Sequence, residues 1–215
     1  MENKGTDLVF ILDKSGSMMG LEKDTIGGFN SLLEKQKGEK GIVWVTTVLF
    51  DHRYTILHDR LPIQGTDPIT ANEYVPGGMT ALYDALGRTI ESLLEIPCKQ
   101  MHGKKSSALF VIITDGEENA SHDYTLERIR ELIELCKERQ GWEFLYLGAN
   151  IDAFSAASKI GIDRGRATRY HADSQGVRVN FETLNSAIGQ VRASEGMSDN
   201  WKDSIEEDFK SRSKG

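Results

Sequence analysis

The chain has 215 residues, 39% of them hydrophobic, which suffices for one domain with a sizeable core and some additional chain. Its formal net charge of −7 at pH 7 argues against a nucleic acid partner, because a general phosphate-binding surface needs an excess of basic residues. The first residues show no signal peptide, and the longest aliphatic and aromatic run, residues 108–113, is far shorter than the roughly 20 residues that span a bilayer. We therefore expect a monomeric, cytoplasmic protein without a membrane partner. Cys98 and Cys136 share no metal-binding or redox spacing, so free thiols are the simpler expectation, and a disulfide between them stays open.

Apolar runs and helical periodicities alternate along the first half of the chain. Five apolar residues at positions 8–12 predict a strand that is covered on both faces. Apolar residues at helical spacing between positions 21 and 33 predict a helix that ends near Gly38. Residues 42–50 and 54–58 predict two further strands. The short turn between these strands requires an antiparallel hairpin, because a parallel return needs a dozen or more residues.

The alternation continues through the second half. A loop rich in proline and glycine at residues 62–78 leads to a helix at residues 82–94, which Pro97 ends. A buried type of strand follows at residues 108–113. The remaining predicted elements are a helix, a strand, a short helix, a weaker strand and a last helix, at residues 126–137, 142–147, 152–160, 167–170 and 181–191.

This order of elements predicts an α/β fold with a doubly wound, mostly parallel six-stranded sheet. One edge strand is antiparallel, and helices cover both faces of the sheet. Right-handed crossovers place the first strand centrally, between the second strand and the strand at residues 108–113. The carboxyl ends of these neighbours form a topological switch point, where open α/β sheets bind ligands.

Oxygen donors collect at that switch point. Asp13, Ser15 and Ser17 alternate in a turn after the first strand, so that one anionic and two neutral oxygens can converge on a hard cation. One turn cannot fill six coordination positions. The candidates for the others are Thr80, after the glycine-rich loop, and Asp115, after the strand at residues 108–113. Taken singly, the first three residues or Thr80 could be helix caps and Asp115 could end a strand, so the prediction depends on their combination.

The five positions resemble the metal-ion-dependent adhesion site (MIDAS) of the von Willebrand factor A family, whose pattern is Asp-x-Ser-x-Ser, then Thr, then Asp. Here the pattern reads Asp13, Ser15 and Ser17, then Thr80, then Asp115. The chain is similar to a bacterial or phage-type single-domain member. The resemblance covers residues 6–192 as one Rossmann-like domain and leaves residues 193–215 as an amphipathic tail.

The resemblance implies a metal-dependent protein–protein interaction module without catalysis. The metal would be Mg²⁺, with Mn²⁺ or Ca²⁺ as alternatives, and the ligand would be a Glu or Asp carboxylate of a protein partner. Specificity would come from the residues nearest the site in sequence. These are Met18, Met19, Met79, Glu117, Glu118, Asn119 and His122.

The alternative function is a metal-dependent hydrolase or phosphotransferase that uses the same site. A phosphotransferase with Asp13 as nucleophile would favour a second carboxylate two residues later, where Ser15 stands, and no well-placed general base is visible. A scaffold without a working metal site is the third possibility.

Several other charged residues have less specific interpretations. Asp84 is either a support for the metal ligands or an exposed helix acid, and Glu117 and Glu118 are interpreted as solvated loop charges. Arg164, Arg166 and Arg169 form a basic cluster that is interpreted as a solvated edge.

The tail carries large apolar residues at intervals of four, which predicts one apolar face of a short helix. We expect this face to pack back on the domain. The alternative is a surface for a partner or for self-association. The residues concerned are Trp201, Ile205 and Phe209.

Overall fold

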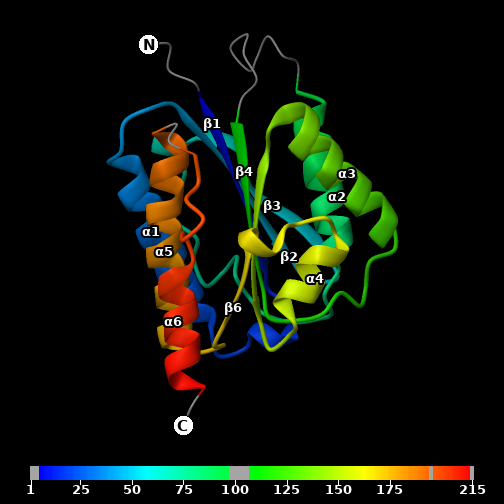
Figure 1. Cartoon of the computed structure of the whole chain (residues 1–215), viewed down its shortest axis with the longest axis vertical. Helices are drawn as coiled ribbons and strands as arrows, with labels where there is room; N and C mark the ends of the chain where they lie inside the picture. Colours follow the sequence, from blue (N-terminus) through cyan, green and yellow to red (C-terminus); the bar gives the residue numbers. More distant parts are fainter. Residues whose placement is uncertain (1–4, 97–106, 194–195, 214–215) are drawn as a thin grey trace.

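A single mixed sheet forms the centre of the protein (Figure 1). In the computed structural model, which describes residues 5–96, 107–193 and 196–213, this sheet has six strands in the order β3-β2-β1-β4-β5-β6. All neighbouring strands are parallel except β2 and β3, which form the predicted antiparallel hairpin. The predicted fold class and the central place of the first strand are confirmed. The strands are β1 (Thr6–Asp13), β2 (Val43–Phe50), β3 (Tyr54–Pro62), β4 (Ser107–Thr114), β5 (Glu143–Ala149) and β6 (Ala167–Tyr170).

Helices cover both faces of the sheet (Figure 1). One face carries α1 (Glu22–Lys37), α5 (Ser174–Arg192) and α6 (Asp203–Arg212). The other carries α2 (Leu82–Leu94), α3 (Leu126–Leu135) and α4 (Ala153–Lys159). None of the helices in the described ranges combines the length and the apolar character needed to cross a membrane.

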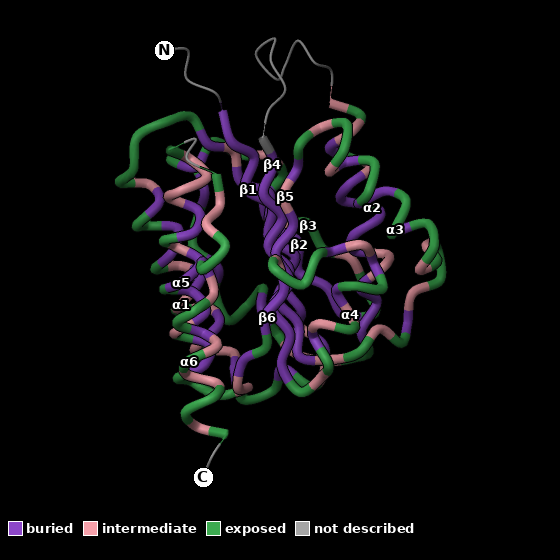
Figure 2. Tube along the Cα trace, in the orientation of Figure 1, coloured by how far each residue is buried: buried purple, intermediate pink, exposed green. Residues whose placement is uncertain are grey.

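Strand β1 shows why an unbroken apolar run suits the centre of such a sheet. Leu8 and Phe10 point into the core beneath α1 and α5, whereas Val9 and Ile11 point into the core beneath α2 and α3. All four side chains are fully buried, and the sheet is buried along its length while the helices expose their outer faces (Figure 2). A strand with only one covered face would alternate polar and apolar residues instead.

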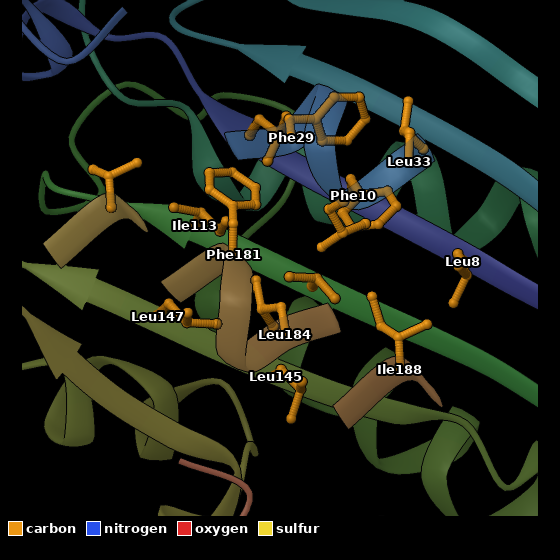
Figure 3. Close-up of a cluster of buried hydrophobic side chains, with 14 of the residues drawn as sticks. Leu8, Phe10, Phe29, Leu33, Ile113, Leu145, Leu147, Phe181, Leu184 and Ile188 are labelled. Atoms are coloured by element: carbon orange, nitrogen blue, oxygen red, sulfur yellow. The ribbon is translucent and has the colours of Figure 1, made fainter. Parts of the chain in front are cut away.

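Aromatic packing joins α1 to the sheet and to α5. The rings of Phe10 and Phe29 meet edge to face, with centroids 5.1 Å apart and an interplanar angle of 88°. Figure 3 shows Phe181, Leu184 and Ile188 of α5 entering the same cluster. Edge-to-face pairs add about 0.5–1.5 kcal/mol to the stabilisation from area burial.

The predicted helix boundaries are set by local hydrogen bonds and one glycine. The Thr125 hydroxyl accepts from the Arg128 amide at 3.3 Å at the start of α3, and the Asp152 carboxylate accepts from the Ser155 amide at 3.1 Å at the start of α4. Gly141 ends the helical segment after α3 with a φ of 67°, a left-handed conformation that favours glycine. Cys136 is a buried free thiol, whereas Cys98 and Pro97 lie outside the described residues.

The tail packs back on the domain, as expected. Ile205 is fully buried in the core shared with α1 and α5, and α6 contacts both α5 and β6. The Trp201 indole is buried as well and donates a hydrogen bond to the Gly165 carbonyl at 2.8 Å. Phe209 remains partly exposed.

Two adjacent glycines of α1 allow a test of the packing between α1 and α5. A Cβ on Gly28 would lie 2.2 Å from Cδ2 of Phe181, whereas a Cβ on Gly27 would meet no atom within 4 Å. We predict that Gly28→Ala lowers the free energy of unfolding by about 1–3 kcal/mol through overpacking. Gly27→Ala should raise it by about 0.5–1 kcal/mol, because alanine loses less entropy in a helix. Urea unfolding of both variants checks this, and shifts of the same sign would contradict it.

Candidate metal centre

Asp13 ends β1 and is held from two sides. One carboxylate oxygen, Oδ1, accepts a hydrogen bond from the Ser15 amide at 2.6 Å, and Oδ2 accepts one from the Thr114 hydroxyl at 2.6 Å. Thr114 is the last residue of β4, the parallel neighbour of β1. The Tyr74 hydroxyl donates to the Asp13 carbonyl oxygen. The carboxylate is therefore buried in a fixed orientation. Thr114 was missed in the sequence, although a hydroxyl directly before Asp115 was a usable signal.

Ser15 and Ser17 lie in the turn that follows. Their hydroxyl oxygens are 3.1 Å apart, and the Ser17 hydroxyl donates to Oδ1 of Asp115. Leu21 precedes the first residue of α1, and neither serine makes a side-chain capping bond. The helix-cap interpretation of these serines is therefore wrong, and their hydroxyls are directed toward the end of β4 instead.

Thr80 is brought to the same place by the loop before α2. Its amide donates to the Asn119 side chain at 2.9 Å, and its carbonyl oxygen accepts from the Asn119 amide at 3.0 Å. Ala81 occupies the cap position of α2 and has no side-chain capping bond, so the Thr80 hydroxyl is not used as a helix cap. Asn119 thus positions Thr80, a role that the sequence did not reveal.

Gly116 shows that the three hydroxyls face one small volume. A Cβ on this residue would lie 2.9 Å from the Thr80 hydroxyl oxygen, 3.3 Å from that of Ser17 and 3.8 Å from that of Ser15. The structure thus brings the side chains of all five predicted site residues together at the carboxyl ends of β1 and β4.

The charges in this volume favour a cation. Asp115 is 2% exposed, and its Oδ2 atom is buried without a hydrogen-bond partner. Burial raises the pKa of Asp13 and the pKa of Asp115, because a charged carboxylate loses solvation there. Hard divalent cations prefer oxygen ligands, so two carboxylates and three hydroxyls fit such an ion. Within the described residues, no group of three or more His, Cys, Asp or Glu side chains is placed to hold a metal.

Backbone bonds join the loops around the site. The Gly16 amide donates to the Gly78 carbonyl at 3.1 Å, and the Gly77 amide donates to the Lys14 carbonyl at 2.9 Å. Gly78 has a φ of 75°, and a Cβ there would lie 2.1 Å from Nδ1 of His52. Lys14 also pairs with Asp51 at 2.9 Å. The first turn and the loop carrying Thr80 are thus fixed to each other.

Two acidic residues have structural roles that the sequence interpretation did not assign to them. Asp84 accepts from the amides of residues 122, 123 and 124 at 3.0, 2.9 and 3.0 Å, so it is not a free helix acid and instead holds the loop after β4. Glu118 accepts from the Tyr83 amide at 2.9 Å and the Ser121 amide at 2.8 Å, so the interpretation as a solvated charge is wrong for this residue. Both carboxylates attach the loop after β4 to the start of α2.

The residues exposed around the site differ in part from the predicted rim. Met19 is 68% exposed and Met79 is 56% exposed, as a rim requires. Met18 is 1% exposed and belongs to the core beneath α1 and α5 instead. Val75, 59% exposed, comes from the loop that also carries Met79.

No family model and no curated protein matches this sequence. Among solved structures, the chain is similar to proximal thread matrix protein 1 from the mussel byssus, with 15% identity over 87% of this chain and 46% of that chain and a TM-score of 0.60. It is also similar to the PilB minor pilin from Streptococcus sanguinis, with 16% identity over 89% of this chain and 63% of that chain and a TM-score of 0.56. The chain has the von Willebrand factor A fold.

Another similar structure is the mussel matrix protein with a zinc-occupied MIDAS motif, at 15% identity and a TM-score of 0.60. The chain spans about half the length of the mussel protein and less than two thirds of the pilin. The likeness therefore concerns the von Willebrand factor A fold and not the roles of those whole proteins.

Gly116 offers a test that leaves every candidate ligand in place. We predict that Gly116→Ala abolishes Mg²⁺ binding, because the added methyl group occupies the volume between the three hydroxyls. At Mg²⁺ concentrations of about 100 times Kd, the unchanged protein should gain about 2.7 kcal/mol, or roughly 5–10 °C in Tm. Gly116→Ala should show no shift. The matched control is Gly77→Ala, whose Cβ meets no atom within 4 Å and which should respond as the unchanged protein does. A normal Mg²⁺ response of Gly116→Ala would contradict the site.

Asp115→Asn should separate the effect of this carboxylate on the stability of the metal-free protein from its effect on Mg²⁺ binding. Since burial raises the folded-state pKa of Asp115, its ionisation costs stability in the metal-free protein as pH rises from about 4. We predict that Asp115→Asn melts above the unchanged protein in chelator at pH 7 but gains nothing from Mg²⁺. The difference in chelator should shrink toward pH 4. The exposed Asp59→Asn is the control, and a lower Tm of Asp115→Asn in chelator at pH 7 would refute the assignment.

Proposed function

We propose that the chain is a metal-dependent protein-binding module without catalysis. Asp13, Ser15, Ser17, Thr80 and Asp115 would hold Mg²⁺, and a Glu or Asp carboxylate of a partner protein would complete its coordination. The observation that carries the proposal is the convergence of three neutral hydroxyls with only two carboxylates beside Gly116. A bound dication would supply a strong electrostatic contact for an anionic oxygen, because this donor set compensates little of its charge.

The hydrogen bonds that the protein itself makes to Asp13 and Asp115 support this charge argument. Both oxygens of Asp13 accept hydrogen bonds, from the Ser15 amide and from the Thr114 hydroxyl. One oxygen of Asp115 accepts from Ser17, and the other has no partner. Much of the negative charge of Asp13 is therefore already engaged by the protein. An outside carboxylate would therefore find a metal charge that the protein compensates only in part.

The surroundings of the site suit a protein ligand. Met19, Val75 and Met79 expose large apolar side chains from the two loops that border the hydroxyls. Methionine is flexible and adapts to irregular partner surfaces. An acidic residue flanked by apolar residues would suit this surface. Its carboxylate would contact the metal, and its apolar neighbours would cover the methionine side chains.

The solved structures support the choice of a binding module at the level of the fold. They are a byssus matrix protein and a minor pilin, and the mussel protein carries zinc in its MIDAS motif. We propose Mg²⁺ for this chain because all its candidate donors are oxygens, with Mn²⁺ and Ca²⁺ as alternatives.

A peptide selection tests the proposal. Peptides that bind the immobilised chain in Mg²⁺ should contain an essential Glu or Asp, and replacing it by Gln or Asn should abolish binding. Chelator or Thr80→Ala should weaken binding by about tenfold or more. Ser186→Ala, an exposed hydroxyl of α5, should change nothing. Binding that is indifferent to chelator and to Thr80→Ala would overturn the proposal, as would hydrolysis or phosphotransfer that is lost in Asp13→Asn.

A further inference from the structure

Of the three arginines near β6, Arg164 and Arg169 are exposed, as expected for a solvated edge, whereas Arg166 is not. Arg166 is partly buried and pairs with Glu143 at 2.9 Å and with Asp199 at 3.9 Å. Arg164 and Arg169 are exposed, and no acidic side chain among the described residues lies within ion-pair distance of either guanidinium group. Within the described ranges, two of the three positive charges thus have no acidic partner.

These two guanidinium groups are nevertheless held in place by aromatic rings. The Arg164 guanidinium carbon lies 4.3 Å from the ring centroid of Phe154, and that of Arg169 lies 4.3 Å from the ring centroid of Phe209. The Phe209 ring also stacks on the His171 ring, with centroids 4.4 Å apart and an interplanar angle of 12°. A guanidinium that stacks on a ring through its face keeps its N–H groups directed outward in one plane.

Both stacked pairs line one pocket. Phe154 comes from α4 and Phe209 from α6, and these helices contact β6 from either side (Figure 1). The pocket has a volume of about 250 Å³. Its lining consists of Phe154, Arg164, Arg169, Glu206, Phe209 and Lys210. None of the five residues of the candidate metal centre takes part.

The single acidic residue of the lining does not neutralise the arginines. Glu206 pairs with Lys202 at 3.2 Å and with Lys210 at 2.9 Å, so its charge is already compensated by two lysines. Neither arginine of the pocket thus has an acidic partner in the part of the chain that the structure describes, and the formal net charge of the chain is −7. Such a local excess of positive charge on an acidic protein concentrates anions at this place.

We propose that this pocket binds a phosphate group, either free or as the monoester of a small molecule. A phosphate monoester carries a charge of about −1.5 to −2 at pH 7 and three acceptor oxygens, which match two guanidinium forks. A carboxylate brings one negative charge and leaves one arginine uncompensated. The volume is below the roughly 300–1,000 Å³ of pockets for drug-sized ligands, so the group attached to the phosphate is small.

Calorimetric titration of the full chain in chelator tests the site, since chelator removes any contribution of a bound metal. The probes are inorganic phosphate, O-phosphoserine and glutamate. We expect both phosphate probes to bind and glutamate to bind about tenfold more weakly or not at all. Tighter binding of O-phosphoserine than of inorganic phosphate identifies a monoester as the ligand, and equal binding identifies the free ion.

Variants connect the binding to the two arginines. Arg164→Gln with Arg169→Gln should weaken phosphate binding by about tenfold or more. Arg169→Lys keeps the positive charge but loses the planar set of N–H donors of the guanidinium group. It should therefore weaken phosphate binding to an intermediate extent. Arg139→Gln, which removes an exposed charge elsewhere, should bind as the unchanged chain does. The proposal is overturned if neither phosphate probe binds, if glutamate binds as tightly, or if the arginine variants bind unchanged.

Discussion

The parallel pairing of β1 with β4 is the constraint on which the candidate metal centre depends. In this register Leu12 lies beside Ile113, so the next residues, Asp13 and Thr114, meet at the same edge of the sheet. The hydrogen bond from Thr114 to Asp13 follows directly from that register. A slip of one residue would move every side chain of a strand to the other face, and both cores oppose it because both faces of β1 are covered. The hydrophobic packing therefore positions polar groups that it does not contact.

The second support of the site is a polar network between the loop after β4 and the start of α2. Asn119 fixes Thr80, and Glu118 and Asp84 join the two segments through backbone amides. These bonds replace the usual side-chain cap of α2, which leaves the Thr80 hydroxyl available. Two carboxylates near the site are thus used for structure, and two others, Asp13 and Asp115, stay in the buried volume where their ionisation is unfavourable.

Most of the fold was predictable because its signals are local and long. The apolar run of β1, the hairpin of β2 and β3, and the helical spacing of apolar residues in α1 depend on neighbouring residues alone. The sequence also allowed the prediction that the five site side chains lie together, because strand order follows from short right-handed connections. The bonds that join Asp84 and Glu118 across the two segments were not accessible, because they connect residues more than 30 positions apart and a loop conformation decides the contact. Met18 and Arg166 were misjudged for the same reason: adjacent residues of one turn or cluster face opposite environments once the chain is folded.

The segment around Trp201 has a consequence for the outermost strand. Lys202 donates to the carbonyl oxygens of Arg164 and Ala167 at 2.8 and 2.7 Å, and the Trp201 indole occupies that of Gly165. Open backbone groups at the border of a sheet invite strands of other molecules to add on, which leads to aggregation. Trp201 and Lys202 occupy the carbonyl oxygen of Ala167, the first residue of β6, and two in the turn just before it, so fewer backbone groups stay open to a strand of another molecule at this border.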